Sequence, residues 1–188
     1  MDLLDFTGQD LYFDTPVPAA VEALLEGAAD EYGSDGGASA EPSLLRAYFL
    51  APEHLSVLVA LYRYYYYQHR LEDALVVAER AIGVSGRELG LDAGLDTGWE
   101  ALDEARLRQI GQRSMTLTRF LLLALKGAGY LELRLGRARN ALERFEKLAA
   151  LDSDGRLGID NLLRMARTLV TEQRARNAGD NLHILHRY

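Results

Sequence analysis

The fold is decided by the stretch Leu55–Ile82, which reads LSVLVALYRYYYYQHRLEDALVVAERAI. Its apolar residues recur at helical spacing in two runs, from near Glu53 to about His69 and from Leu71 to about Gly83. The first run holds five of the ten tyrosines of the chain. Small residues recur in the second run, where two helices must approach closely. The sequence therefore predicts two helices joined by a tight turn.

The composition of the chain indicates one helical domain or a short repeat array. Of 188 residues, 48% are hydrophobic and only 4 are proline, which favours helices over disorder. No cysteine occurs, and this excludes disulfides, thiol catalysis and cysteine-ligated metal. The opening MDLLDF is not a signal peptide, and the most apolar run, Phe120–Leu125, is too short to span a bilayer. We expect a cytoplasmic protein without membrane contact.

The charge is unevenly distributed along the chain. Residues 1–60 hold 11 of the 28 acidic residues and a single base, Arg46, whereas residues 61–188 hold 17 acids and 20 bases. An acidic front and a mildly basic rear are compatible with an ordinary solvated surface. They are also compatible with an orienting field or with head-to-tail contact between molecules. The acidic balance argues against nucleic-acid binding, which needs a concentrated basic face.

Helical periodicity predicts further helices on both sides of the central hairpin. A Gly-rich break at residues 33–37, a long Gly-rich loop at 83–98 and a DSDG turn at 152–155 separate them. Residues 1–16 lack helical period and predict an extended arm, and residues 177–188 predict a flexible tail. The expected helices are 16–32, 41–50, 98–110, 114–135, 137–151 and 158–174.

Overlaying the helical pairs reveals a period of about 34 residues. One copy carries Leu58, Leu61, Tyr65, Ala74, Ala78 and Ala81 after Pro52, and another carries Leu125, Ala128, Gly129, Gly136, Ala141 and Phe145. A weaker copy covers 21–54. At these positions the chain resembles the tetratricopeptide repeat family. It departs from the family pattern at Tyr62 and His69, which stand where that pattern has glycine, so a splayed or specially accommodated helix pair is expected at Tyr62.

The resemblance implies a right-handed α-solenoid of stacked hairpins over residues 17–176. Its units would be 21–54, 55–88, a worn unit with the Gly-rich loop at 89–121, and 122–155. A C-terminal capping helix at 156–176 would close the stack.

The resemblance also implies a concave groove lined by the first helix of each unit. The predicted partner-binding residues are Val59, Arg63, Tyr66, Tyr67, Lys126, Tyr130 and Arg134. Aromatic side chains with interspersed cations suit a peptide that carries carboxylates. In the tyrosine run, Tyr62 and Tyr65 are expected to point inward, which leaves Tyr66 and Tyr67 for a partner. Arg63, Lys126 and Arg134 are equally compatible with ordinary solvated charges.

Catalytic and metal-binding motifs do not emerge from the sequence. There is no phosphate-binding Gly-Lys-Ser/Thr, no Gly-x-Ser-x-Gly and no His-Glu-x-x-His. His183 and His186 lack a third ligand for a metal, and the calcium-loop reading of 152–155 fails because its twelfth position is Leu163. We therefore expect no cofactor, no metal and no enzymatic activity.

Three functional readings remain for such a chain. The first is an adaptor or accessory factor that binds another protein, the second a self-assembling structural protein, and the third a hydrolase built on helices. The N-terminal arm and opening motif also resemble small repeat proteins encoded among bacterial nitrogen-fixation genes. That resemblance implies an accessory role in nitrogen fixation.

Overall fold

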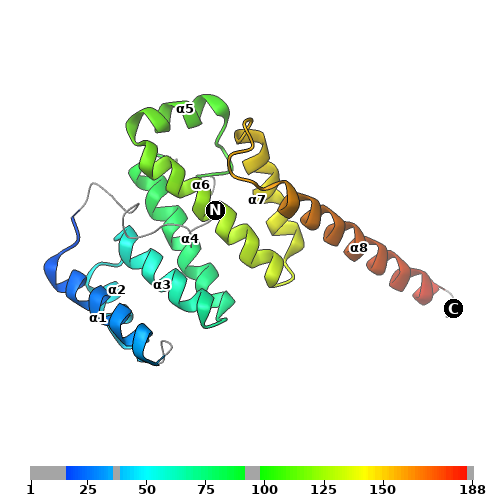
Figure 1. Ribbon diagram of the computed structural model, residues 1–188. Helices are drawn as coiled ribbons and strands as arrows, with labels where there is room; N and C mark the ends of the chain where they lie inside the picture. Colours follow the sequence, from blue (N-terminus) through cyan, green and yellow to red (C-terminus); the bar gives the residue numbers. More distant parts are fainter. Residues whose placement is uncertain (1–15, 36–38, 92–97, 186–188) are drawn as a thin grey trace.

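The computed structural model describes residues 16–35, 39–91 and 98–185, and all its regular elements are helices (Figure 1). The predicted all-α class is therefore confirmed, with no strand among the described residues. No described helix is both long enough and apolar enough to cross a membrane. The helices are α1 (Ala19–Asp35), α2 (Ala40–Leu50), α3 (Leu55–Tyr67), α4 (Leu71–Glu88), α5 (Glu104–Arg113), α6 (Met115–Arg134), α7 (Ala138–Leu151) and α8 (Asp160–Leu185).

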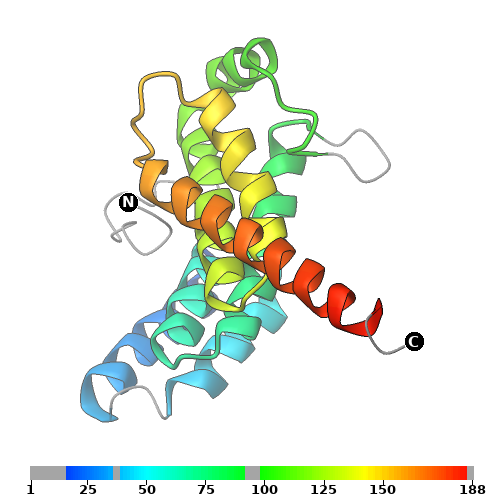
Figure 2. The same ribbon diagram turned by 90° about the vertical axis from the view of Figure 1, so that its right-hand side faces the viewer.

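The helices pack largely in chain order. Three pairs form hairpins, α1 with α2, α3 with α4 and α6 with α7, and α8 packs on α7. The second hairpin meets the third mainly through α4 and α6. Helix α5 packs against α6 and lies at one end of the molecule in Figure 2, so the described part of residues 89–121 adds no further hairpin between the second and the third. Their described part supplies α5 and the first turns of α6.

The turns of the second and third hairpins share one geometry, although their sequences differ. The amide of Arg70 donates to the Tyr65 carbonyl at 2.9 Å, and the amide of Arg137 donates to the Glu132 carbonyl at 2.8 Å. Such bonds close a helix when the residue before the donor has a positive φ. His69 has φ 57° and Gly136 has φ 77°. The acceptor, the positive-φ residue and the donor in the turn of the second hairpin thus each correspond to the residue 67 positions later in the turn of the third.

The second and third hairpins place their large and small buried residues on opposite helices. In the third hairpin, a Cβ on Gly129 would stand 2.9 Å from Cε1 of the fully buried Phe145. At the corresponding positions 67 residues earlier, the second hairpin has Tyr62 and Ala78, which are both fully buried. A large residue on the first helix therefore goes with a small one on the second. This exchange is compatible with a specially accommodated helix pair, one of the two arrangements expected at Tyr62.

Two helices run further than their periodicity indicated. Helix α4 does not stop near Gly83 but continues to Glu88, because Val84, Ser85 and the adjoining Leu89 are buried. That burial outweighs the poor helix propensity of glycine, which costs about 1 kcal/mol per residue. Helix α8 continues beyond residue 176 to Leu185, into the segment predicted as a tail.

Two further boundaries differ at Gly-rich segments. Helix α5 begins later than expected, because the Asp103 carboxylate accepts a hydrogen bond from the Arg106 amide at 2.7 Å and caps the helix there. Helix α1 passes Gly33 and ends at Asp35. Residues 1–15 of the predicted arm and the centre of the Gly-rich loop, 92–97, lie outside the described residues.

Candidate partner-binding surface

Tyrosine rings from α3 and α6 meet at one surface, although 63 or more residues separate them in sequence. The Tyr66 ring lies 6.3 Å from that of Tyr130 and 5.6 Å from that of Tyr67, and it stacks on Tyr62 at 6.2 Å. Tyr67 is 48% exposed, Tyr66 and Tyr130 are half-buried, and Tyr62 is fully buried beneath them. We call Tyr66, Tyr67, Tyr130 and Arg134 the tyrosine–arginine surface.

Arg134 supplies the positive charge of this surface. Its Nη1 donates to the Tyr130 hydroxyl at 3.1 Å, and its guanidinium carbon lies 5.9 Å from the centre of that ring. The hydrogen bond to Tyr130 raises the pKa of Arg134, which keeps the side chain charged. A guanidinium has five N–H donors, and this bond uses one of them. The exposed side of Arg134 can therefore bind a carboxylate.

The remaining predicted residues divide between surface and interior. Arg63 is half-buried on α3. Val59 is only 2% exposed, so it offers a partner no surface. Lys126 is also buried, and its Nζ donates to the Leu157 carbonyl at 2.6 Å, which ties α6 to the segment before α8. Lys126 thus holds a loop in place here. The periodicity could not show this, because the contact depends on where the loop returns.

Tyr62, Tyr64 and Tyr65 are buried, and the inward orientation predicted for Tyr62 and Tyr65 is confirmed. The Tyr65 hydroxyl donates to the Glu41 carboxylate at 3.4 Å, and the Arg70 guanidinium lies over its ring at 4.5 Å. Burial raises the pKa of the Tyr65 hydroxyl, and Glu41 raises it further, so Tyr65 stays neutral.

A repeated arginine pairs with the preceding hairpin, and sequence reasoning missed this. Arg70 bonds Glu41 of α2 at 2.6 Å, and Arg137 bonds Glu72 of α4 at 2.7 Å. Both arginines stand directly after the positive-φ residue of a turn. The available signal was the shared spacing of 67 residues between the two arginines. The pairs are solvent-exposed, so each contributes at most about 1 kcal/mol.

A buried ionic cluster joins the second hairpin to the third, and it was also missed. The Arg144 side chain is 9% exposed, its Nε donates to Glu132 at 3.1 Å, and its Nη2 donates to Glu79. Its guanidinium carbon lies 5.0 Å from the centre of the Trp99 ring. Burial raises the pKa of both carboxyls, and Arg144 opposes that rise. Nε and Nη2 of Arg144 are bonded within the cluster, whereas its buried Nη1 has no hydrogen-bond partner among the described residues. The pairing of Arg144 with both carboxylates indicates a structural role.

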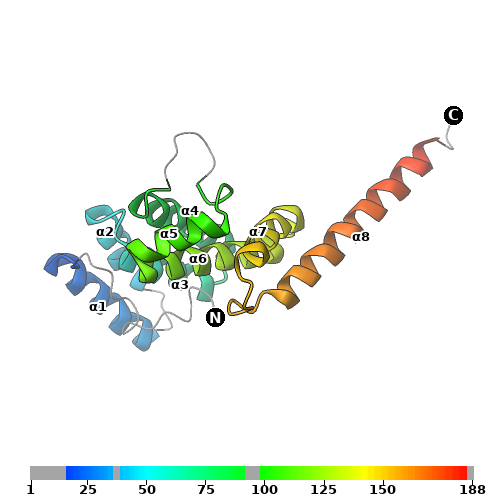
Figure 3. The same cartoon turned by 90° about the horizontal axis from the view of Figure 1, so that it is seen from above.

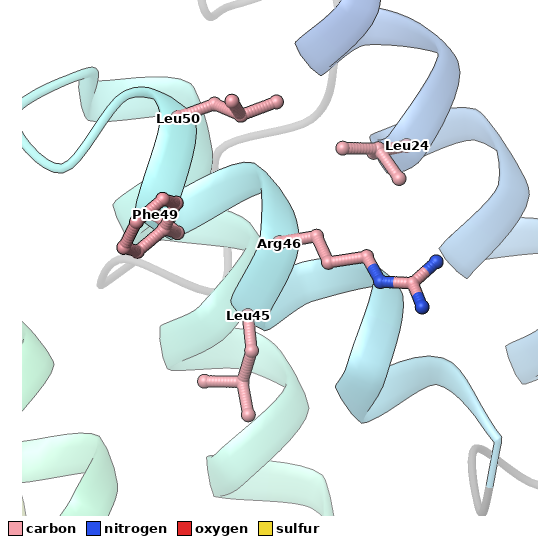
Figure 4. A pocket seen from close by; sticks show the side chains of 5 residues that line it. All are labelled: Leu24, Leu45, Arg46, Phe49 and Leu50. Carbon is pink, nitrogen blue, oxygen red and sulfur yellow. The ribbon is translucent and has the colours of Figure 1, made fainter.

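A second, apolar surface lies on the first hairpin (Figure 4). Phe49 is 86% exposed, Leu50 57% and Leu45 45%, and together with Leu24 and Arg46 they line an open hollow of about 450 Å³. We call Leu45, Phe49 and Leu50 the α2 patch. A signal was present in the sequence, because six of the seven residues 44–50 are apolar and cannot all lie on one helix face.

These features define an all-helical protein of packed hairpins with an exposed aromatic surface. A protein of Azotobacter chroococcum mcd 1 is 46% identical to the chain over 163 residues, which is 87% of each protein. It is described as an uncharacterized 19.8 kDa protein in the nifW 5' region. The chain belongs to the family of that protein. No protein-family model matches the chain, and no solved structure matches it.

Proposed function

We propose that the chain is a non-enzymatic, cytoplasmic adaptor that binds another protein through the tyrosine–arginine surface. The supporting observation is the meeting of Tyr66 on α3 with Tyr130 on α6 at 6.3 Å. We further propose that the hairpins stack as a right-handed solenoid of tetratricopeptide type, with α8 as its cap. Two hairpins with one turn geometry and a 67-residue offset support this arrangement.

The chemistry of the surface selects the partner that it would bind. Tyrosine offers a large contact area at a low cost in side-chain entropy, and it adds a hydroxyl for hydrogen bonding. Arg134 adds a charged donor that pairs well with a carboxylate. A peptide that combines apolar or aromatic side chains with Asp or Glu, or with a free C-terminal carboxylate, would use all of these groups. We propose that class of peptide as the ligand.

Peptide display on the intact chain tests this proposal. We expect the selected peptides to be enriched in acidic residues and to bind Arg134→Glu at least about tenfold more weakly, since losing one charge-assisted hydrogen bond costs about 1.5–3 kcal/mol. Tyr67→Ala should also weaken binding. Met115→Ala is the matched control, because Met115 is 69% exposed and lies on α6 outside the surface.

A photo-crosslinking amino acid locates the contact independently. Placed at position 67, it should attach to the selected peptide, and placed at the exposed Val76 on α4 it should not. Equal crosslinking at both positions, or undiminished binding by Arg134→Glu, would contradict the assignment of this surface.

A second candidate is an accessory role in nitrogen fixation, favoured by the nifW 5' region named for the Azotobacter relative. Deletion of that relative's gene should slow growth on dinitrogen and leave growth on ammonium unchanged. Complementation by this chain, and its loss with Arg134→Glu, would connect the role to the tyrosine–arginine surface. Equal growth of the deletion strain on both nitrogen sources would remove this candidate.

A further inference from the structure

The first hairpin presents an apolar face that no described element covers. The exposed side chains of the α2 patch, with Phe49 86% exposed, surround the hollow that Leu24 of α1 completes. In Figure 1 this hairpin lies at the end of the molecule opposite to α8. Soluble monomers rarely leave adjoining large apolar side chains in water without a use for them. We therefore expect a binding partner to cover the α2 patch.

Helix α8 carries two apolar stripes, and α7 covers one of them fully. Leu163, Ala166 and Val170 are buried in the core. Leu162, Met165 and Leu169 recur at intervals of three and four residues beside that stripe, so they share a second helix face. Met165 is 54% exposed and the two leucines are half-buried. Figure 3 shows that α8 projects from the body on the side away from α1 and α2.

The two ends carry opposite charge. Helix α1 has five acidic residues and no base, and Glu22, Glu26 and Asp30 among them are exposed. Helix α8 has four arginines and one acid between Arg164 and Arg176. Opposite potentials on two apolar surfaces favour their encounter and fix its orientation. The same charges disfavour contact between two α1/α2 ends, because both would be acidic.

We propose that α8 of one copy docks by Leu162, Met165 and Leu169 on the α2 patch of a second copy, with its arginines beside the acids of α1. The contact is head-to-tail, so it joins different surfaces of the two copies and leaves one of each surface open. Such contacts extend into open chains unless the geometry closes a ring. The occupant of the apolar hollow is the amphipathic α8 of a neighbour, in the manner of a helix in a groove.

Light scattering after size exclusion tests this on the full chain. The mass should rise above the 20.9 kDa of the monomer as concentration rises, and it should fall again as salt screens the charges. Phe49→Asp disables the patch and Met165→Asp disables the α8 stripe. Each variant alone should stay monomeric. Met115→Asp, at an equally exposed apolar position on α6, should associate like the unmodified chain.

Mixing the two disabled variants gives the decisive measurement. Phe49→Asp retains an intact α8 and Met165→Asp retains an intact patch, so the mixture should form a complex of twice the monomer mass and no larger. Circular dichroism must show unchanged helicity for both variants. A monomeric unmodified chain at every concentration would overturn the proposal. So would a mixture that stays monomeric, which would leave another protein as the occupant of the patch. Association of Met165→Asp alone would also overturn it, because the patch would then meet the patch of a second copy.

Discussion

At the scale of single residues, the turns show how one backbone geometry is reached with different side chains. His69 and Gly136 both have the left-handed conformation that lets the next amide reach back to its helix. A side chain in this region costs roughly 1–2 kcal/mol, which glycine avoids. His69 is exposed, so little packing compensates for that cost. The sequence identified position 69 as a place for glycine, and the backbone geometry gives the reason.

Reciprocal substitutions at the two turns should have opposite effects. His69→Gly should raise the free energy of unfolding by about 1 kcal/mol, and Gly136→Ala should lower it by a similar amount, because only glycine has no Cβ to clash at a positive φ. Urea denaturation measures both. Gly27→Ala is a control for glycine replacement alone, since no atom lies within 4 Å of its added Cβ. Destabilisation by His69→Gly would contradict this account of the turn.

At the scale of helical elements, the second and third hairpins each combine a large buried residue on one helix with a small one on the other. Gly129 on α6 gives room to the Phe145 ring of α7. At the positions 67 residues earlier, α3 has the buried Tyr62 and α4 has the buried Ala78. Interiors are close-packed, so a change on one helix needs an opposite change on its partner. This explains why the tetratricopeptide pattern looked broken at Tyr62 while the hairpin is intact.

Two glycines in helices should therefore respond differently to alanine. Gly129→Ala should lower the free energy of unfolding by about 1–2 kcal/mol, because overpacking against Phe145 exceeds the gain in helix propensity. Gly83→Ala should raise it by up to about 1 kcal/mol, because the added Cβ would meet only Nη1 of Arg87, at 3.6 Å, which is an ordinary contact distance. Thermal unfolding of both variants makes the comparison. Equal shifts in unfolding temperature would show that the Phe145 ring moves aside at no cost in stability.

At the scale of the whole molecule, the buried Arg144 cluster fixes the third hairpin against the second. Arg144 on α7 bonds Glu132 on α6 and Glu79 on α4, and the Trp99 ring covers it. Buried ion pairs contribute little net stability when complete, but removing one partner leaves an uncompensated charge. The cluster therefore acts mainly to set how the hairpins meet.

Arg144→Leu should destabilise the protein by about 3 kcal/mol at pH 7, and by less near pH 5. Burial raises the pKa of the Glu132 carboxyl, and losing Arg144 removes the charge that opposed this rise. The folded state then binds a proton more tightly than the unfolded state. Stability is lost as pH rises from the unfolded pKa through the raised folded pKa, and it returns as pH falls.

Urea denaturation at both pH values measures this dependence. Arg137→Leu is the matched control, because Arg137 also joins α7 to α4 but its pair with Glu72 is exposed. Its effect should stay below about 1 kcal/mol and change little with pH. A pH-independent loss in Arg144→Leu would show that packing on Trp99, not charge, holds the interface.

The sequence by itself determined the helical class and most helix positions, because apolar spacing and turn residues act locally. Tertiary structure alone decided where burial overrides local preference, as in α4 beyond Gly83. It also decided which surface residues come together. Tyr66 on α3 and Tyr130 on α6 meet because α4 packs on both helices, and Lys126 is buried by a returning loop. The α2 patch is exposed because no described helix covers it. Such contacts depend on distances between elements, and no local spacing of residues encodes them.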